Sequence, residues 1–199
     1  MAEQGAPQKY VLCENRNGPP TGERCLKKLT PGRWYVVQTL KGQEEKTIAD
    51  IRRNVLEDDE DIFIMENEKM FKHQGKWEPD RVNLFPGYIF VVTRRPEEFN
   101  QRLHRKHRTL KLMTVGETIT AIRPEEEKLL KYLGGEDHVV RYSEGFRDGD
   151  RIVVETGPLK GYEGEIKHLD RHNRQAQITM TLFGVETNVT LGLGIVRVI

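Results

Sequence analysis

The sequence has little cysteine and no long apolar run. Its 199 residues include only two cysteines, too few for a disulfide framework, which favours an intracellular protein. No stretch reaches the roughly 18 consecutive apolar residues of a membrane-spanning helix, and no signal-peptide pattern opens the chain. The sequence predicts a cytoplasmic protein without a membrane partner, and we expect it to be a monomer.

The chain also lacks a net charge of either sign. It carries 32 basic and 31 acidic side chains, a formal net charge of +1, so the net charge does not indicate a nucleic-acid partner. The charges are segregated instead: residues 57–61 are five consecutive acids, whereas residues 94–111 hold seven Lys or Arg against two Glu. Such segregation can attract a polyanion that the total charge would not reveal.

Recognisable catalytic and metal-binding patterns are missing as well. There is no phosphate-binding loop of the Walker type and no Ser-x-x-Lys. Cys13 and Cys25 have no His nearby. His104 and His107 have no further ligand close in the sequence, so no metal site is expected. We predict a binding protein without a cofactor rather than an enzyme; a carboxylate-dependent nuclease or metal enzyme is the minor alternative.

What the sequence does contain is a series of strand patterns between Gly145 and Leu193. Turn residues separate apolar or alternating segments at residues 152–154, 165–169, 176–181 and 185–191. The whole stretch is predicted to form five short strands, four of which these patterns locate. Five short strands in so short a segment cannot bury one face as an open sheet, so closure into a small barrel is expected. The density of Val, Ile and Thr favours these strands over a helical hairpin.

The preceding part of the chain predicts an α+β domain with helices on a mostly antiparallel sheet. Strand patterns occupy residues 33–39, 61–65, 69–72, 77–82 and 84–92, and helical patterns occupy residues 43–56, 96–106 and 124–133. Residues 1–32 contain too little apolar surface to fold alone and are expected to form a flexible extension. Residues 136–144 look polar and strandless, which predicts a linker between domains at 33–135 and 145–199.

Three segments carry a resemblance to a known family: residues 34–46 (WYVVQTLKGQEEK), 84–91 (LFPGYIFV) and 149–166 (GDRIVVETGPLKGYEGEI). The last looks like a KOW motif. In this order the segments resemble NusG-like transcription elongation factors, in which an NGN domain precedes a KOW domain of the SH3-like barrel type. The resemblance covers residues 33–199. Residues 166–176 (IKHLDRHNRQA) are most similar to specialised antiterminator paralogs of the LoaP type.

The resemblance implies three kinds of contact. The NGN domain would bind the clamp of RNA polymerase through Trp34, Tyr35, Phe85, Pro86, Gly87, Tyr88 and Phe90, although strand aromatics are more often core residues. Upstream or non-template DNA would meet Arg102, Arg105, Lys106, His107, Arg108 and Thr109, for which a solvated helix end is the competing interpretation. The barrel would bind RNA through Lys160, Lys167, His168, Arg171, His172, Arg174 and Gln175, from two turns expected at one rim.

The function implied is processive elongation and antitermination. For a specialised paralog the barrel would contact a nascent RNA hairpin and act on particular operons. For a general NusG the barrel would bind a ribosomal protein or a termination factor instead. A ribosome-associated RNA-binding module is the third alternative, and it leaves residues 84–92 without a role. Residues 149–199 hold six basic and six acidic side chains, so RNA binding there would depend on the placement of single residues.

Overall fold

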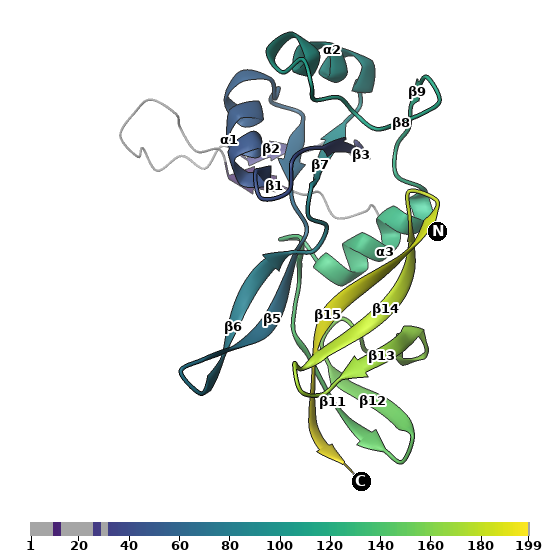
Figure 1. Ribbon diagram of the computed structural model, residues 1–199. Coiled ribbons are helices and arrows are strands. Elements are labelled where there is room, and N and C mark those ends of the chain that lie inside the picture. The colour runs from purple at the N-terminus through teal and green to yellow at the C-terminus, as the bar shows by residue number, and fades with distance from the viewer. Residues whose placement is uncertain (1–9, 13–25, 29–31, 199) are drawn as a thin grey trace.

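The polypeptide forms two lobes that lie against each other (Figure 1). The computed structural model describes residues 10–12, 26–28 and 32–198. We call residues 33–140 the N-terminal lobe and residues 143–198 the barrel. Helix α3 (Pro124–Gly134) lies between the upper part of the N-terminal lobe and the barrel in this view.

The central sheet of the N-terminal lobe has strand order β3-β7-β4, formed by β3 (Arg33–Gln38), β7 (Tyr88–Thr93) and β4 (Asp61–Phe63), all paired antiparallel. Helices α1 (Glu44–Asn54) and α2 (Pro96–Lys106) lie on one face of this sheet. Between the sheet and these helices lies a first apolar cluster. Its members include Tyr35, Val37, Ile48, Ile51, Ile62, Ile89, Val91, Phe99 and Leu103.

The opposite face of the same sheet is also apolar. Because successive strand side chains point to opposite faces, Trp34 and Val36 of β3 and Phe90 of β7 point away from α1 and α2. Phe63 of β4, opposite Phe90, lies on this face too. A sheet that is apolar on both faces needs a second covering layer.

A long hairpin extends from the N-terminal lobe beside the barrel. Its strands are β5 (Glu66–His73) and β6 (Lys76–Asn83), and the short strand β10 (Val139–Val140) pairs parallel with β5. Two further ladders are short: β1 (Tyr10–Leu12) pairs with β2 (Leu26–Lys28), and β8 (Thr114–Val115) with β9 (Thr118–Ile119). Cys13, Cys25 and most of the predicted flexible extension lie outside the described residues.

The prediction of a strandless linker at residues 136–144 is wrong. Val139 and Val140 form β10 and are almost fully buried, and Ser143 and Glu144 already belong to the first strand of the barrel. Two residues, 141 and 142, join the lobes. The backbone N–H of Tyr142 donates to the Glu68 carboxylate, which ties the connection to β5.

The barrel is a five-stranded sheet with strand order β12-β11-β15-β14-β13. Its strands are β11 (Ser143–Asp148), β12 (Arg151–Thr156), β13 (Ile166–Asp170), β14 (Gln175–Leu182) and β15 (Val185–Val198), with a 3₁₀ turn, η1, at Glu163–Glu165. Strand β11, which pairs parallel with β15, is the one that the sequence patterns missed. Side chains from both edge strands, including Val154 and Leu169, join one cluster, as a small barrel requires. These strands confirm the predicted fold class.

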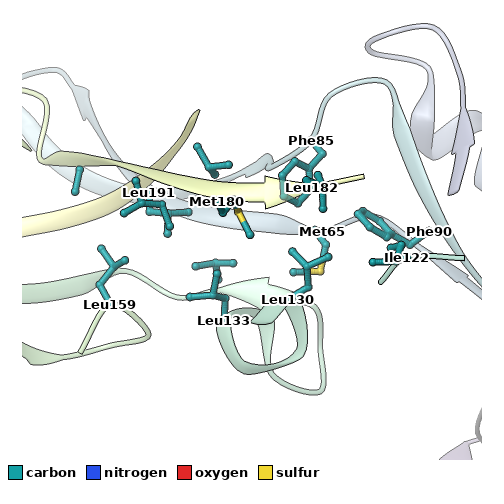
Figure 2. Packing of buried hydrophobic residues seen from close by; sticks show 14 of the residues in the cluster. Met65, Phe85, Phe90, Ile122, Leu130, Leu133, Leu159, Met180, Leu182 and Leu191 are labelled. Carbon is teal, nitrogen blue, oxygen red and sulfur yellow. The ribbon is translucent and has the colours of Figure 1, made fainter. Parts of the chain in front are cut away.

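The barrel supplies the second layer over the sheet. A single cluster of buried side chains runs from Phe90 and Met65 of the N-terminal lobe, past Leu130 of α3, to Leu182 and Leu191 of the barrel. Figure 2 shows the labelled side chains in one continuous band, in which Leu133 and Leu130 lie across from Met180 and Leu182, and Phe90 and Ile122 lie at one end. The core of the barrel and the outer face of the central sheet are therefore one apolar interior.

Candidate interaction surfaces

The aromatic face of the central sheet is tightly organised. The rings of Trp34 and Phe63 meet edge to face with centroids 4.8 Å apart, and Phe63 stacks on Phe90 at 5.5 Å. Phe85, in the turn between β6 and β7, contacts the Phe90 ring at 5.9 Å. Such pairs contribute about 0.5–1.5 kcal/mol each beyond their area burial. We call Trp34, Phe63, Phe85, Tyr88 and Phe90 the aromatic face.

The turn that precedes β7 is held in place by a buried carboxylate. Glu44, at the start of α1, is only 6% exposed, and its Oε1 accepts the backbone N–H of Gly87 at 2.6 Å. Gly87 has φ of +90°, a conformation that glycine adopts without strain. Pro86 is left exposed at the tip, while Phe85 and Tyr88 point toward the barrel side.

One predicted polymerase contact, Tyr35, lies on the opposite face of the central sheet from the other aromatic candidates. Tyr35 points into the cluster beneath α1 and α2, and burial raises the pKa of its phenol. Tyr35 therefore does not share a face with the other aromatic candidates, because side chains alternate along β3 and Tyr35 points away from Trp34. Its role in polymerase binding stays a prediction. Trp34, Phe85, Tyr88 and Phe90 do come together.

Polar and aromatic contacts surround the apolar seam between the lobes. Tyr88 stacks on Phe183 of the barrel with centroids 5.6 Å apart. Tyr132 of α3 contacts Tyr162 at 5.2 Å, and its hydroxyl donates to a backbone oxygen of the barrel at 3.2 Å. Asn67, fully buried on β5, donates from Nδ2 to the Thr190 backbone oxygen at 2.9 Å.

A second buried carboxylate connects α3 to the barrel. Glu126 is 4% exposed, and one of its oxygens accepts the backbone N–H of Arg123 in a capping box. The other oxygen accepts the backbone N–H of Gly184, in the turn between β14 and β15, at 2.9 Å. A buried carboxylate is stable only with such donors, so this contact fixes the barrel turn against the start of α3.

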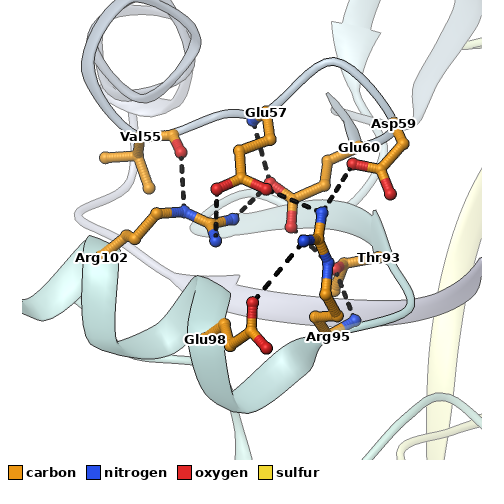
Figure 3. A network of polar contacts seen from close by, with 8 residues as sticks. All are labelled: Val55, Glu57, Asp59, Glu60, Thr93, Arg95, Glu98 and Arg102. Atoms are coloured by element: carbon orange, nitrogen blue, oxygen red, sulfur yellow. Dashed lines mark hydrogen bonds and ion pairs between the residues drawn. The ribbon is translucent and has the colours of Figure 1, made fainter.

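Arg102, a predicted DNA contact, is engaged inside the N-terminal lobe (Figure 3). Its guanidinium donates to Glu60 at 2.6 Å and to the Val55 backbone oxygen at 3.1 Å, and it also pairs with Glu57 at 3.0 Å. Arg95 joins the same acidic loop through Glu57. The acidic run that the sequence singled out therefore partners the basic helix of its own chain. A DNA contact by Arg102 stays a prediction, and it would compete with these contacts inside the lobe.

The remaining DNA candidates form an exposed basic end of α2. Arg105, Lys106, Arg108 and Thr109 are exposed, and no protein contact fixes their positions in the described part of the chain. His107 differs, because its Nε2 lies 2.8 Å from an Asp50 carboxylate oxygen on α1. We keep the four exposed residues as candidate phosphate contacts and assign His107 to the contact between the helices.

The predicted RNA residues do not meet at one rim. Lys160 precedes β13 and lies near α3, whereas Arg171, His172 and Arg174 follow β13. Five strand residues separate the two turns by roughly 15 Å at 3.3 Å per residue, so the expected single cluster is wrong. The exposed basic group in the barrel is narrower. It consists of Lys167, His168, Arg171 and His172, which we call the basic turn.

Arg174 belongs to the seam rather than to the basic turn. Its guanidinium lies 4.5 Å from the centre of the Trp77 ring on β6, a cation–π contact between the lobes. Burial raises the pKa of the nearby Tyr142 hydroxyl, while the positive charge of Arg174 opposes that rise. Gln175, next to it, opens β14.

The basic turn itself has a defined shape. Asn173 donates from its backbone N–H and from Nδ2 to the Asp170 carboxylate, at 2.9 and 2.7 Å. These donors lower the pKa of Asp170, so the carboxylate stays ionised and the turn stays closed at neutral pH. Arg171 and His172 are thereby presented to solvent. Within the described residues, no group of His, Cys, Asp or Glu could hold a metal ion, and no helix could span a membrane.

The chain is similar in sequence to known proteins. A family model described as "Transcription termination factor nusG" matches residues 32–131, half of the chain. The chain belongs to the NusG family. Its relatives include the transcription termination/antitermination protein NusG of Thermus thermophilus, 27% identical over 172 residues, covering 79% of this chain and 94% of that protein. NusG of Borreliella burgdorferi is 25% identical over 170 residues, covering 78% and 92%.

These relatives of the NusG-family chain are named as general NusG proteins, not as LoaP-type antiterminators. The similarity extends to a solved structure described as "Domain interaction in Thermotoga maritima NusG". It is 21% identical, covers 80% of this chain and 93% of that one, and has a TM-score of 0.46. Family membership places the protein in transcription.

Some residues in the apolar seam between the lobes were not predicted from the sequence to lie there. Phe63, Met65 and Leu130 lie in the seam, yet none stands in a motif that the resemblance picked out. Strand alternation could have assigned Phe63 and Met65 to one face, and helical spacing does assign Leu130 to the apolar face of its helix. No local signal indicates that the barrel covers these side chains.

Proposed function

We propose that the protein is a transcription elongation factor that binds the clamp of RNA polymerase with its aromatic face. The observation that supports this is an apolar sheet face turned away from the lobe's own helices α1 and α2. Large aromatic side chains make efficient anchors because each buries much surface with few rotatable bonds. Binding would shift RNA polymerase toward its closed, processive state, because a factor that binds the closed state more tightly than the open state stabilises the closed one.

The experiment is binding of purified RNA polymerase by two matched variants. Tyr88→Ala and Tyr132→Ala each remove one aromatic contact between the lobes, but only Tyr88 belongs to the aromatic face. We expect Tyr88→Ala to weaken polymerase binding about tenfold or more, as loss of an interface aromatic does. Tyr132→Ala should not weaken it. Equal loss in both variants, or in neither, would contradict the assignment of the face.

For the barrel, we propose contact with a nascent RNA hairpin through the basic turn. Arg171 and His172 are exposed there, and RNA hairpins offer phosphates and unpaired loop bases to such side chains. This contact would support operon-specific antitermination of the LoaP type. The DNA candidates at the end of α2 would contribute only sequence-independent phosphate contacts.

General NusG activity is the second candidate, and the names of the relatives favour it. In that case the barrel would bind a ribosomal protein or a termination factor. Leader-RNA hairpins and scrambled RNA, tested at two salt concentrations, separate the candidates. Selective binding that Arg171→Ala abolishes supports the RNA reader, whereas weak binding that salt removes equally for every RNA supports the general factor.

A further inference from the structure

The β5–β6 hairpin of the N-terminal lobe lies next to the basic turn of the barrel. Figure 1 shows the hairpin beside the barrel, on the side where β13 ends and β14 begins. The two segments meet where the Arg174 guanidinium lies 4.5 Å from the centre of the Trp77 ring on β6. Arg171 is close to this contact, because residues 171–174 form the turn between two paired strands. A ligand of the basic turn would therefore meet the hairpin as well.

One face of the hairpin carries the side chains on the side of the basic turn. Lys72 is directly opposite Trp77 in the β5–β6 register, so the two side chains share a face, with Cβ atoms about 5 Å apart. Lys72 is exposed, and Trp77 is partly buried. The neighbouring Lys76 and Glu78 point to the other face, because side chains alternate along β6. The hairpin therefore adds a cation and an aromatic ring to the basic turn.

The carboxylates along these segments are already paired. Glu68, on the same face of β5, forms ion pairs with Arg81 and Arg141. Asp170 accepts its hydrogen bonds from Asn173 inside the turn. The surface between the hairpin and the turn therefore offers positive charge beside an aromatic ring, the combination that binds phosphates and unpaired bases.

We propose that the hairpin and the basic turn bind one RNA together, with Lys72 and Arg171 on phosphates and Trp77 and Arg174 against an unpaired base. This inference rests on the proposed RNA contact of the barrel and adds the N-terminal lobe to it. Unpaired RNA bases stack on aromatic rings and on guanidinium planes, and Trp77 and Arg174 offer both side by side. Because a paired base cannot stack in this way, the surface selects an RNA with a single-stranded loop over a continuous duplex.

The first test asks whether the hairpin contacts phosphate. The probe is a fluorescein-labelled RNA stem-loop with every base type in its loop, titrated with the full-length protein at several salt concentrations. Lys72→Ala should weaken binding about threefold to tenfold and lower the slope of log affinity against log salt by about one, as loss of one phosphate contact does. Lys76→Ala removes the same charge from the other face of the hairpin and should weaken binding less than about twofold.

The second test detects stacking directly. The chain has two tryptophans, and Trp34 is only 3% exposed, so Trp77 is the one that RNA can reach. The stem-loop should quench tryptophan emission, the same stem as a blunt duplex should not, and Trp77→Phe should remove the quenching. Trp77→Ala should weaken stem-loop binding about tenfold, whereas Trp77→Phe, which keeps a ring for stacking, should weaken it less.

Loss of stacking must be separated from loss of a contact between the lobes, because Trp77 also touches Arg174. Tyr132→Ala is the matched variant, since it removes a contact between the lobes with Tyr162, in another part of the seam. Stem-loop affinity should be unchanged in Tyr132→Ala. Circular dichroism checks that every variant keeps the strands of the unaltered chain.

The outcomes separate this inference from the proposed function. Weaker stem-loop binding in Arg171→Ala, with Lys72→Ala and Trp77→Ala unchanged, would overturn the shared surface and leave the barrel as the RNA reader. Binding without quenching, or equal binding of stem-loop and duplex, would overturn stacking on Trp77. Equal losses in Tyr132→Ala and Trp77→Ala would reduce Trp77 to a contact between the lobes. No binding of any RNA by the unaltered chain would instead overturn the proposed RNA contact and favour a protein partner.

Discussion

At the scale of single residues, Arg102 lies in a basic segment that predicted a DNA contact, but in the structure it pairs with a buried glutamate of its own lobe. The side chain of Glu60 is 1% exposed, and Arg102 is its partner at 2.6 Å. Glu60 also accepts a hydrogen bond from the Thr93 hydroxyl at 2.8 Å. A carboxylate this deeply buried needs its positive partner, because an uncompensated charge in the interior is costly.

We therefore expect Arg102→Ala to lower the free energy of unfolding by about 3 kcal/mol, the lower end of the range for breaking a buried ion pair, because Arg102 is partly exposed. Urea unfolding at neutral pH measures this change. Arg105→Ala, three residues along the same helix and exposed, should change stability by less than about 0.5 kcal/mol. A stable Arg102→Ala protein with reduced DNA binding would return Arg102 to the DNA surface.

Asp61 gives a pH-dependent prediction. Burial raises the pKa of this carboxyl, although the backbone N–H of Ile62 and the charge of Arg52 oppose the rise. A raised pKa means that the folded state favours the protonated form, so stability is lost as the pH rises through the pKa of the folded state. Asp61→Asn keeps the acceptor for Ile62 and cannot ionise.

The variant Asp61→Asn should therefore be more stable than the unaltered chain at pH 7. Its advantage should shrink as the pH is lowered below about 4, where the aspartate is protonated in both states. Denaturant unfolding at a series of pH values measures the difference. An advantage that grows on acidification would show that the positive charge of Arg52 outweighs burial at Asp61.

At the scale of elements, α3 connects the lobes as well as completing one of them. Glu126→Ala removes the acceptor for both the Arg123 and Gly184 backbone N–H groups, and should cost about 1–2 kcal/mol of stability. Amide hydrogen exchange at Gly184 should accelerate. Glu126→Gln keeps one acceptor oxygen and should show a smaller effect. Unchanged exchange at Gly184 in Glu126→Ala would mean that α3 does not hold the barrel turn.

The sequence predicted most elements and missed those defined by distant pairing. Helices α1, α2 and α3 agree with their predicted positions within a few residues, because apolar periodicity, acidic first turns and proline starts are local signals. Strand β10 was missed because two valines in a polar segment carry no period, and their strand exists only through pairing with β5. Such pairing has no local signature.

In the candidate surfaces too, residues with a local signal were predicted correctly and residues with distant partners were not. Strand alternation correctly predicted that Phe90 and Tyr88 lie on one face. The polar turn residues around Arg171 correctly predicted that this side chain is exposed. Reasoning along the sequence could not assign Arg174 to Trp77, about a hundred residues earlier in the chain, or Arg102 to the acidic loop. Long-range partners of charged residues depend on the tertiary fold. The predicted roles in binding polymerase, DNA and RNA stay predictions.

At the scale of the whole molecule, the shared interior predicts cooperative unfolding. The cluster that joins the lobes should make the full-length protein unfold in one thermal transition, because the barrel loses part of its covering when the N-terminal lobe unfolds. Differential scanning calorimetry of the full-length protein measures the number of transitions. Two transitions in the unaltered chain would indicate that the lobes are already independent at rest.

The proposed function requires that RNA polymerase binds the aromatic face. Amide hydrogen exchange of the full-length protein, alone and bound to RNA polymerase, tests this directly. We predict protection of residues 84–90 on binding. Protection confined to the barrel, with residues 84–90 unchanged, would contradict the claim.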